Sequence, residues 1–358
     1  MAGLSCRWVQ IGCKGPCCAA LSVYSHTVYD LPPTLNDPWC VMTTPLDCHW
    51  AGVFPAATTQ FDADLQLDLP ATQAVQTALV RDGVHGIVVL GTVGENNSLN
   101  PDEKRAVLRA TVEAVGGKVP IISGVSEFTT ANAVAYARDA ERSGVDGLMV
   151  LPAMVYVPTP AELEQHFRAV AQATRLPIML YNNPPAYRVN IDFGTLGRLA
   201  QLPNIVALKE SAPDPRRFTD LFNTFGERFI MFAGLDDVAF EGLCLGARGW
   251  VSGLTNAFPR ESLQFYAALH AGDLERARKI YRWFMPLLHL DAEHDLVQSI
   301  KLAESLMGRG SERVRPPRLP LAGARREQVM EMVRRAAAER PVCAHEVSIL
   351  LYRWSYRG

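Results

Sequence analysis

Eight short apolar runs alternate with longer segments of helical periodicity from Gly52 onward, and this alternation is the strongest constraint on the fold. It predicts βαβ units and a parallel sheet. The runs Ile87-Val88-Val89-Leu90 and Ile205-Val206-Ala207-Leu208 are apolar throughout, as expected of parallel strands buried on both faces. The predicted strands are residues 52–58, 86–90, 119–124, 147–151, 178–181, 205–208, 229–233 and 249–251.

The segments between these runs carry signals for helix starts. Asn100 is a predicted N-cap because Pro101 follows it, and Asp102 and Glu103 favour the positive end of a helix. Thr159 before Pro160 repeats the pattern. We therefore expect helices over residues 101–115, 129–143 and 159–174.

The number of units favours a closed sheet. Eight βα units in about 200 residues form a (β/α)8 TIM barrel more naturally than an open sheet. A doubly wound sheet is the alternative, but it requires a G-x-G-x-x-G motif after its first strand, and none is there. Residues 260–308 and 324–340 predict a C-terminal helical extension, for which an oligomer contact is one role.

Both ends of the chain differ from the barrel in composition. Six of the eight cysteines precede residue 50, but the rest of the chain offers no matching His/Cys pair, and no secretory hydrophobic segment precedes them. We interpret residues 1–48 as a disordered or non-native extension rather than a zinc site or disulfide knot, with Met42 as an alternative start. Residues 49–340 are the predicted barrel with its helices, and residues 341–358 a tail.

The charge and hydropathy of the chain narrow its partners. A formal net charge of −2 gives no reason to expect nucleic acid or an anionic membrane as partner. No apolar run approaches the roughly 20 residues that span a bilayer. We expect a cytoplasmic protein that acts on a small molecule.

The first candidate for chemistry is Lys209, directly after the sixth run. Active sites of such barrels lie at the carboxyl ends of the strands. There a lysine is partly desolvated, which lowers its pKa and frees the amine to attack a carbonyl. A lysine at a strand end more often extends its amine into solvent, so position alone does not decide the role.

Two further candidates follow other strands. Tyr181 ends the fifth run, and a phenol beside an imine-forming lysine can shuttle protons, although a lone tyrosine more often caps a barrel core. The loop of residues 91–96 follows the second run. Its two glycines permit tight turns, and its N–H groups with the Thr92 hydroxyl are suited to a carboxylate; a purely structural turn is the alternative.

These features occur together as the motifs G-T-V-G-E (91–95), Y-N-N-P (181–184) and A-L-K-E (207–210). With A-G-L-D (233–236) and G-W-V-S-G (249–253), they resemble the signatures of the dihydrodipicolinate synthase and N-acetylneuraminate lyase family. The resemblance covers residues 49–329. It implies that Lys209 is the Schiff-base nucleophile, that Tyr181 is the proton relay, and that Thr92 couples to this tyrosine and helps bind the carboxylate of a 2-oxo acid.

The resemblance also implies the rest of the pocket. Val93 stands where many members have a second threonine, so only its backbone N–H is available to the substrate. The backbone at Gly234 and Val251 is expected beside the imine. The family needs no metal or organic cofactor, and its members are commonly homotetramers, which is the assembly we expect here.

Three positions bear on the choice of family member. Dihydrodipicolinate synthase carries an arginine after Y-N-x-P that binds the carboxylate of its aldehyde substrate, and in register this chain has Ala186, which cannot pair with a carboxylate. Arg188 is either a replacement that reaches the substrate or a solvated loop charge. Tyr156, in a loop that lacks the usual P-Y-Y pattern, is a candidate replacement for a lost aromatic.

Three stretches look like the branch that contains Δ1-pyrroline-4-hydroxy-2-carboxylate deaminase of hydroxyproline catabolism: residues 181–189, 250–259 and 282–291. This likeness implies a Schiff-base lyase that converts the cyclic imine to 2-oxoglutarate semialdehyde and ammonia. The alternatives are an aldolase for a 4-hydroxy-2-oxo acid, a condensing enzyme like dihydrodipicolinate synthase, and a catalytically silent barrel with a binding or regulatory role.

Overall fold

The structure, a computed structural model, describes residues 45–153 and 156–341. Met42, the cysteines before it and the tail from residue 342 lie outside the described residues, so our interpretation of the two ends stays a prediction. Leu46 donates its backbone N–H to the Pro203 carbonyl at 2.8 Å, which ties the start of the described chain to the loop before the sixth strand.

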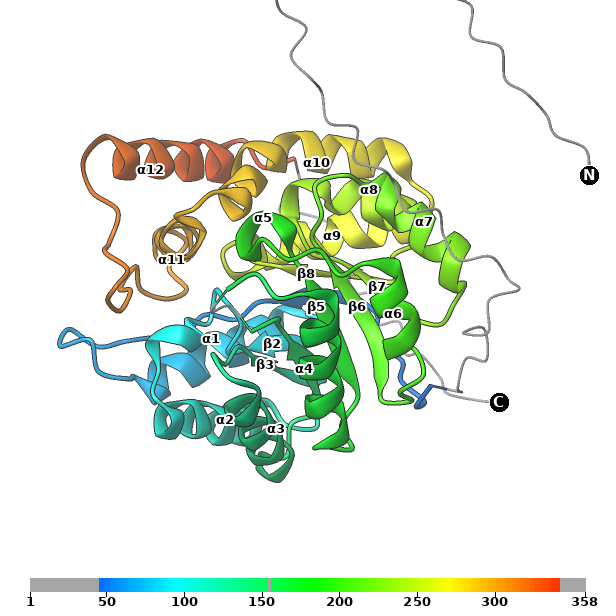
Figure 1. The fold of residues 1–358 in the computed structure, drawn as a ribbon. Coiled ribbons are helices and arrows are strands. Elements are labelled where there is room, and N and C mark those ends of the chain that lie inside the picture. The colour runs from blue at the N-terminus through cyan, green and yellow to red at the C-terminus, as the bar shows by residue number, and fades with distance from the viewer. Residues whose placement is uncertain (1–44, 154–155, 342–358) are drawn as a thin grey trace, which may run out of the picture. The chain divides into compact units, whose positions relative to one another are not determined.

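Eight parallel strands, all buried along their whole length, form one sheet (Figure 1). They are β1 (Gly52–Pro55), β2 (Ile87–Val89), β3 (Ile121–Val125), β4 (Gly147–Val150), β5 (Ile178–Asn182), β6 (Ile205–Glu210), β7 (Ile230–Ala233) and β8 (Gly249–Ser252). Their order is β1-β8-β7-β6-β5-β4-β3-β2. A parallel bridge between Ala56 and Val88 joins the two ends of this order, so the sheet closes and the predicted (β/α)8 TIM barrel is confirmed.

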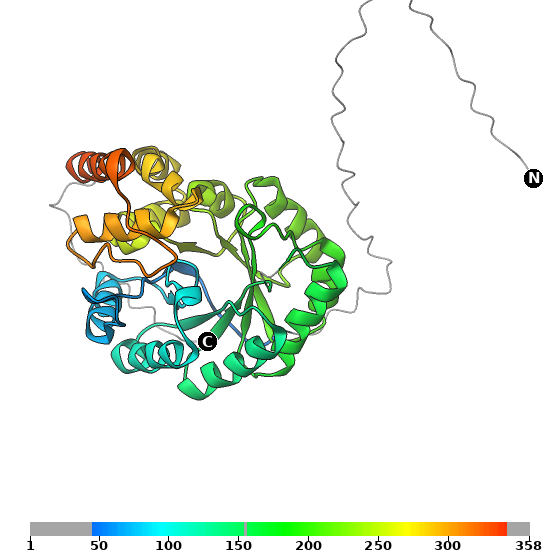
Figure 2. The ribbon, with the colours of Figure 1, turned by 60° about the vertical axis from the view of Figure 1, so that its left-hand side comes forward.

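Helices follow the strands and surround the sheet (Figure 2). They are α1 (Leu69–Asp82), α2 (Pro101–Val115), α3 (Thr130–Ser143), α4 (Pro160–Gln172), the short α5 (Pro184–Tyr187), α6 (Phe193–Leu199), α7 (Arg216–Phe225) and α8 (Ala239–Cys244). Helix α2 begins where predicted: the Asn100 side chain accepts from the N–H groups of Asp102 and Glu103, and the Glu103 carboxylate accepts from the Asn100 N–H. Thr159 and Glu162 form the same capping box on α4.

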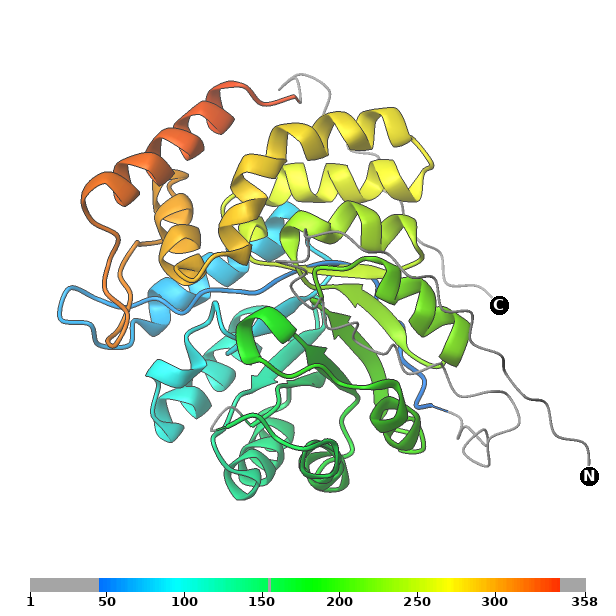
Figure 3. The ribbon, with the colours of Figure 1, turned by 45° about the horizontal axis from the view of Figure 1, so that its top comes forward.

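The predicted C-terminal extension consists of α9 (Pro259–His270), α10 (Leu274–Leu288), α11 (Leu296–Leu306) and α12 (Gly323–Ala338). A short 3-10 helix, η4 (His289–Ala292), connects α10 to α11. Figure 3 shows α12 beside α10 and α11, on one side of the barrel. None of the described helices is long and apolar enough to cross a membrane.

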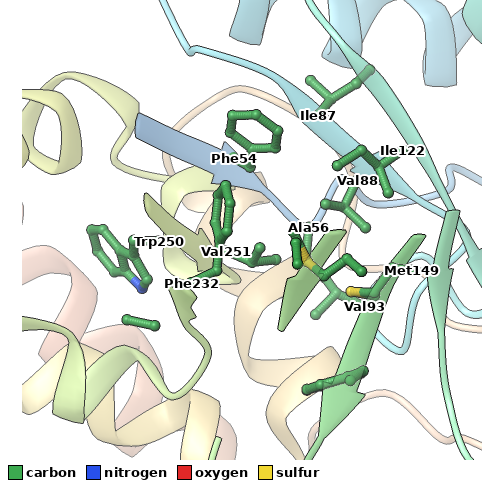
Figure 4. Packing of buried hydrophobic residues seen from close by; sticks show 14 of the residues in the cluster. Phe54, Ala56, Ile87, Val88, Val93, Ile122, Met149, Phe232, Trp250 and Val251 are labelled. Carbon is green, nitrogen blue, oxygen red and sulfur yellow. The ribbon is translucent and has the colours of Figure 1, made fainter. Parts of the chain in front are cut away.

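Aromatic side chains fill part of the core between the strands (Figure 4). The rings of Phe54 on β1 and Phe232 on β7 meet edge to face, with centroids 5.2 Å apart. Trp250 is fully buried and donates its indole N–H to the Asp236 carboxylate at 2.9 Å.

The carboxyl ends of two strands differ from the prediction by more than one residue. Strand β1 stops at Pro55, earlier than predicted. Strand β6 continues past Leu208 to Glu210, so that Lys209 and Glu210 pair with Tyr181 and Asn182 of β5. The Asn182 amide donates to both Glu210 carboxylate oxygens, at 2.8 and 3.0 Å. This bond lets a charged residue end a buried strand, which the apolar pattern alone does not predict.

Candidate active site

A cavity opens at the carboxyl ends of the strands, where the fold class predicts the active site. Its polar lining comes from Thr92, Asn183, Tyr181, Tyr187, Lys209 and Asp291. Ala56, Val93 and Met149, all labelled in Figure 4, contribute to the apolar lining. The structure therefore brings together the three residues that the motifs single out: Lys209, Tyr181 and Thr92.

Lys209 is the penultimate residue of β6 and is 5% exposed. Burial lowers the pKa of its amine, while the acidic groups of Asp291 and Asp236 act in the opposite direction. A lowered pKa increases the fraction of neutral amine, the form that attacks a carbonyl or imine carbon. Lys209 thus has the environment of a Schiff-base lysine rather than of a solvated strand end.

Tyr181 lies beside Lys209, because the two residues are direct register partners on β5 and β6. The Lys209 Nζ lies 4.0 Å from the centroid of the Tyr181 ring. Asn183 donates its side-chain amide to the Tyr181 hydroxyl at 2.9 Å, and burial raises the pKa of this phenol to about 12. The phenol therefore keeps its proton at neutral pH and can exchange it with a group at the amine.

Thr92 contacts a second tyrosine of the cavity, Tyr187. Its hydroxyl lies 2.5 Å from the hydroxyl of Tyr187, at the end of α5. The Tyr187 ring in turn meets the Tyr181 ring edge to face, with centroids 5.5 Å apart. Tyr187 therefore links the threonine to the tyrosine beside the lysine. Sequence reasoning missed this role, although Tyr187 lies in the stretch that carries the Y-N-N-P motif.

The loop after β2 contributes to the cavity through Gly91, Thr92 and Val93. Glu95, the last residue of its motif, does not line the cavity: it is fully buried and its carboxylate pairs with Lys301 of α11 at 2.9 Å. The G-T-V-G-E motif thus combines a cavity wall with an anchor to the C-terminal helices.

Four predicted site residues remain, and none of them is part of the cavity lining. Gly234 packs against the stem of Lys209: a Cβ there would lie 2.9 Å from the lysine Cγ. Val251 is buried in β8 and does not line the cavity. Arg188 is exposed, and Tyr156 is 61% exposed with its hydroxyl donating to Glu162 at 2.9 Å. Neither of these last two side chains reaches the cavity.

Asp291 is a second cavity residue, after Tyr187, whose role the sequence did not indicate. It lies on η4, far along the chain from the barrel strands, and its carboxyl enters the cavity beside Lys209. Burial raises its pKa to about 6, partly offset by the nearby lysine. The only signal in the sequence was an acidic residue at the end of the apolar stretch 282–291, which looks like an ordinary helix end.

The match to a family model covers most of the chain. The model, described as the dihydrodipicolinate synthetase family, matches residues 49–336. The chain is 34% identical over 280 residues to the 4-hydroxy-tetrahydrodipicolinate synthase of Moorella thermoacetica, an alignment that covers 78% of this chain and 95% of that protein. The enzyme of the same name from Sorangium cellulosum is 34% identical over 292 residues, covering 81% and 97%.

Solved structures agree in fold. A putative dihydrodipicolinate synthetase from Pseudomonas aeruginosa superposes with a TM-score of 0.77 and 33% identity, covering 80% of this chain and 100% of that one. A prophage protein of the dihydrodipicolinic acid synthase family from E. coli K12, in complex with pyruvate, superposes with a TM-score of 0.77 and 28% identity, covering 81% and 99%.

Proposed function

The chain belongs to the dihydrodipicolinate synthetase family, and we propose that within it the protein is a Δ1-pyrroline-4-hydroxy-2-carboxylate deaminase. Members of this family are lysine Schiff-base lyases and synthases, so the chain is an enzyme of that type. This membership argues against a catalytically silent barrel. The deaminase is the finer assignment, and the composition of the cavity supports it.

The observation that carries the proposal is the charge of the cavity. Among the described residues that line it, none is an arginine; Ala186 lies at the wall and Asp291 adds a carboxyl group. A second substrate carboxylate would meet no cationic partner other than Lys209 itself and would be repelled by an ionised Asp291. The cavity therefore favours a substrate with one carboxylate and a cationic or hydroxylated far end.

The proposed substrate meets this requirement. Its carboxylate is attached to C2, the carbon that Lys209 attacks, and we assign that carboxylate to the Thr92 loop. Its C4 carries a hydroxyl, and its C5 becomes an aminomethyl group once the ring opens. As an ammonium, this group is attracted to the Asp291 carboxylate.

The reaction balances without a redox partner. Lys209 adds to C2, the bond from C2 to the ring nitrogen breaks, and the lysine imine of 5-amino-4-hydroxy-2-oxopentanoate forms. Loss of a proton from C3 gives an enamine, which expels the 4-hydroxyl as water. Proton shifts then convert the C5 amine to an imine. Hydrolysis at C2 and C5 releases Lys209, ammonia and 2-oxoglutarate semialdehyde, with a net uptake of one water.

In this scheme Tyr181 exchanges protons with the carbinolamine, through the Tyr187 and Thr92 hydroxyls. The contacts that support this role are the 4.0 Å approach of the Lys209 Nζ to the Tyr181 ring and the 2.5 Å bond between Thr92 and Tyr187. The E. coli relative in complex with pyruvate supports a 2-oxo acid as the core of the ligand.

The second candidate is a condensing enzyme, which the names of the M. thermoacetica and S. cellulosum relatives favour. It would use pyruvate and an aldehyde with its own carboxylate, for which Ala186 provides no partner. An aldolase acting on 4-hydroxy-2-oxoglutarate meets the same difficulty, because that substrate has a second carboxylate near Asp291.

The proposed function is tested by incubating the purified protein with Δ1-pyrroline-4-hydroxy-2-carboxylate and measuring ammonia and 2-oxoglutarate semialdehyde. We expect turnover that Lys209→Ala abolishes and that Lys279→Ala, at an exposed position of α10, retains. No turnover in a protein that still traps pyruvate with borohydride would contradict the deaminase. Pyruvate with aspartate semialdehyde, and 4-hydroxy-2-oxoglutarate, would then be the substrates to assay.

The assembly is part of the same proposal. Oligomers are common in the family, and we infer a homotetramer located in the cytoplasm. Light scattering of the purified protein measures the mass of the assembly, and a monomer mass would contradict this inference.

A further inference from the structure

We propose that Asp291, contributed by the C-terminal helical region rather than by the barrel, is the catalytic acid that protonates the departing 4-hydroxyl. The inference rests on the proposed function, because only that reaction provides such a leaving group. It assigns the C–O bond cleavage to a residue outside the three family motifs.

The position of Asp291 is the first argument. It lies on η4 between α10 and α11, and its carboxyl lines the cavity that also contains the Lys209 amine and the Tyr181 ring. Tyr181 is a register partner of Lys209, so its hydroxyl is assigned to proton transfer at C2, the carbon bonded to the lysine. A second proton-transfer group in the same cavity is available for an atom further along the substrate, such as the oxygen on C4.

The hydrogen bonds of two neighbouring carboxyls are the second argument. Asp236 accepts from Trp250 Nε1 at 2.9 Å, Ser252 Oγ at 3.2 Å and Leu254 N at 2.9 Å, so its oxygens are engaged in holding the barrel end together. Among the described residues, the only hydrogen bond to the Asp291 carboxyl is a long one, from the Asp236 N–H to Oδ2 at 3.4 Å. Asp291 therefore retains capacity to exchange a proton with a ligand.

Gly253 supplies the space for this carboxyl. It also lines the cavity, and a Cβ at this position would lie 2.5 Å from Asp291 Oδ1 and 2.4 Å from Ile300 Cδ1. Only glycine leaves room for Oδ1 where it is. The G-W-V-S-G motif on and after β8 thus makes a place for a side chain from a distant part of the chain.

Electrostatics suit Asp291 to proton transfer in both directions. Burial raises its pKa to about 6, the cationic form of Lys209 lowers it, and Asp237 raises it. With this pKa the Asp291 carboxylate can take up the proton lost from C3 and return it to the leaving oxygen on C4. The titratable groups around it are Lys209 of β6, Tyr181 of β5, Tyr187 of α5, Asp236 and Asp237 of η2 (Asp236–Val238), and His289 of η4.

The step itself is balanced. The electron pair of the Lys209 enamine nitrogen forms the N=C2 bond, and the C2=C3 pair forms a C3=C4 double bond. The C4–O bond breaks, and the Asp291 proton goes to the leaving oxygen to form water. The products are water, an Asp291 carboxylate, and a protonated imine at C2 that is conjugated with the C3=C4 double bond. That carboxylate then lies next to the C5 ammonium, from which the following proton shift starts.

The test compares Asp291→Asn with the unchanged protein. Asparagine keeps the size and the acceptor for the Asp236 N–H but cannot donate a carboxylic proton. We expect Asp291→Asn to form the pyruvate imine as the unchanged protein does, and to lose about 10²–10⁴-fold in deaminase turnover. Borohydride added during turnover should trap, in this variant, a ring-opened adduct that retains the 4-hydroxyl oxygen, which intact-protein mass spectrometry distinguishes from a dehydrated adduct.

Two matched variants complete the design. Asp220→Asn removes a carboxylate at an exposed position of α7, outside the cavity, and it should retain turnover. Gly253→Ala displaces the Asp291 carboxyl and should reduce turnover as Asp291→Asn does, with pyruvate trapping retained.

Each other result overturns the inference. Turnover by Asp291→Asn at the unchanged rate would show that no acid is needed at this position. Loss of pyruvate trapping in Asp291→Asn would assign the residue to imine formation or to folding. Absence of deaminase turnover in the unchanged protein would overturn the proposed function and, with it, the leaving group; normal turnover in both proteins would overturn the role of Asp291 alone.

Discussion

Lys301 and Glu95 form a fully buried ion pair, with the lysine Nζ 2.9 Å from the glutamate Oε1. Lys301 lies on α11, and Glu95 ends the loop that carries Thr92. The same Nζ donates to the Thr59 carbonyl at 2.8 Å, and the Arg315 N–H donates to the second Glu95 oxygen at 3.0 Å. This pair joins α11 to the loop that carries Thr92. Because η4 directly precedes α11, the pair also helps to fix Asp291 at the cavity.

We expect Lys301→Met to reduce the free energy of unfolding by about 3–5 kcal/mol, because it leaves the Glu95 charge buried without its partner. Urea unfolding followed by circular dichroism measures the change. Adding Glu95→Gln to Lys301→Met should recover part of the loss, because the unpaired charge is then removed. An unfolding midpoint unaffected by Lys301→Met would contradict this role.

The raised pKa of the buried Glu304 carboxyl should make the free energy of unfolding depend on pH. Burial raises its pKa to about 7, although Thr58 donates to its carboxylate at 2.8 Å. In the unfolded chain its pKa is about 4.3, so the folded state holds this proton more tightly. The contribution of the protonated Glu304 carboxyl to the free energy of unfolding is fully present below about pH 4. This contribution, up to about 3 kcal/mol, is lost as the pH rises to about 7.

Glu304→Gln should remove this contribution. The variant is then expected to gain stability relative to the unchanged protein as the pH rises through this window, which urea unfolding at several pH values measures. A difference in stability that stays constant with pH would argue against a buried proton on Glu304.

The Thr92–Tyr187 hydrogen bond predicts a non-additive pair of variants. Thr92→Val and Tyr187→Phe each remove the same 2.5 Å bond, so the second change has little left to remove. We expect each to reduce kcat about 10–100-fold and the double variant to resemble the worse single one. Steady-state kinetics of the four proteins give the coupling energy, and simple multiplication of the two effects would mean that the residues act independently.

Tyr181→Phe tests the proton relay at the lysine. It removes the hydroxyl but keeps the ring over which the Lys209 amine lies, so we expect kcat to fall about 10²–10⁴-fold without loss of fold. Tyr136→Phe is the matched control, because that buried hydroxyl bonds Ser123 at 2.7 Å, outside the cavity. If the two variants had equal activity, a catalytic role for the Tyr181 hydroxyl would be excluded.

The amino-acid sequence by itself determined the barrel and most of its helices. Parallel strands covered on both faces are apolar runs, so β2 (Ile87–Val89) and the first four residues of β6, 205–208, are recognisable without tertiary information. Caps act within one turn, so the starts of α2 and α4 are also local properties. Since the carboxyl ends of parallel strands meet at one end of a barrel, residues that follow different strands come together, which is why Lys209, Tyr181 and Thr92 could be grouped.

Only the tertiary structure decided which groups complete the site. Asp291 lines the same cavity as Lys209 because η4 follows α10 at the barrel end. The Thr92 hydroxyl bonds Tyr187 because α5 places its last residue at the cavity. The pairing of Lys301 with Glu95 likewise joins two distant segments. Such contacts leave no periodic pattern in the sequence, because they depend on how separate elements pack and not on the spacing of residues within one element.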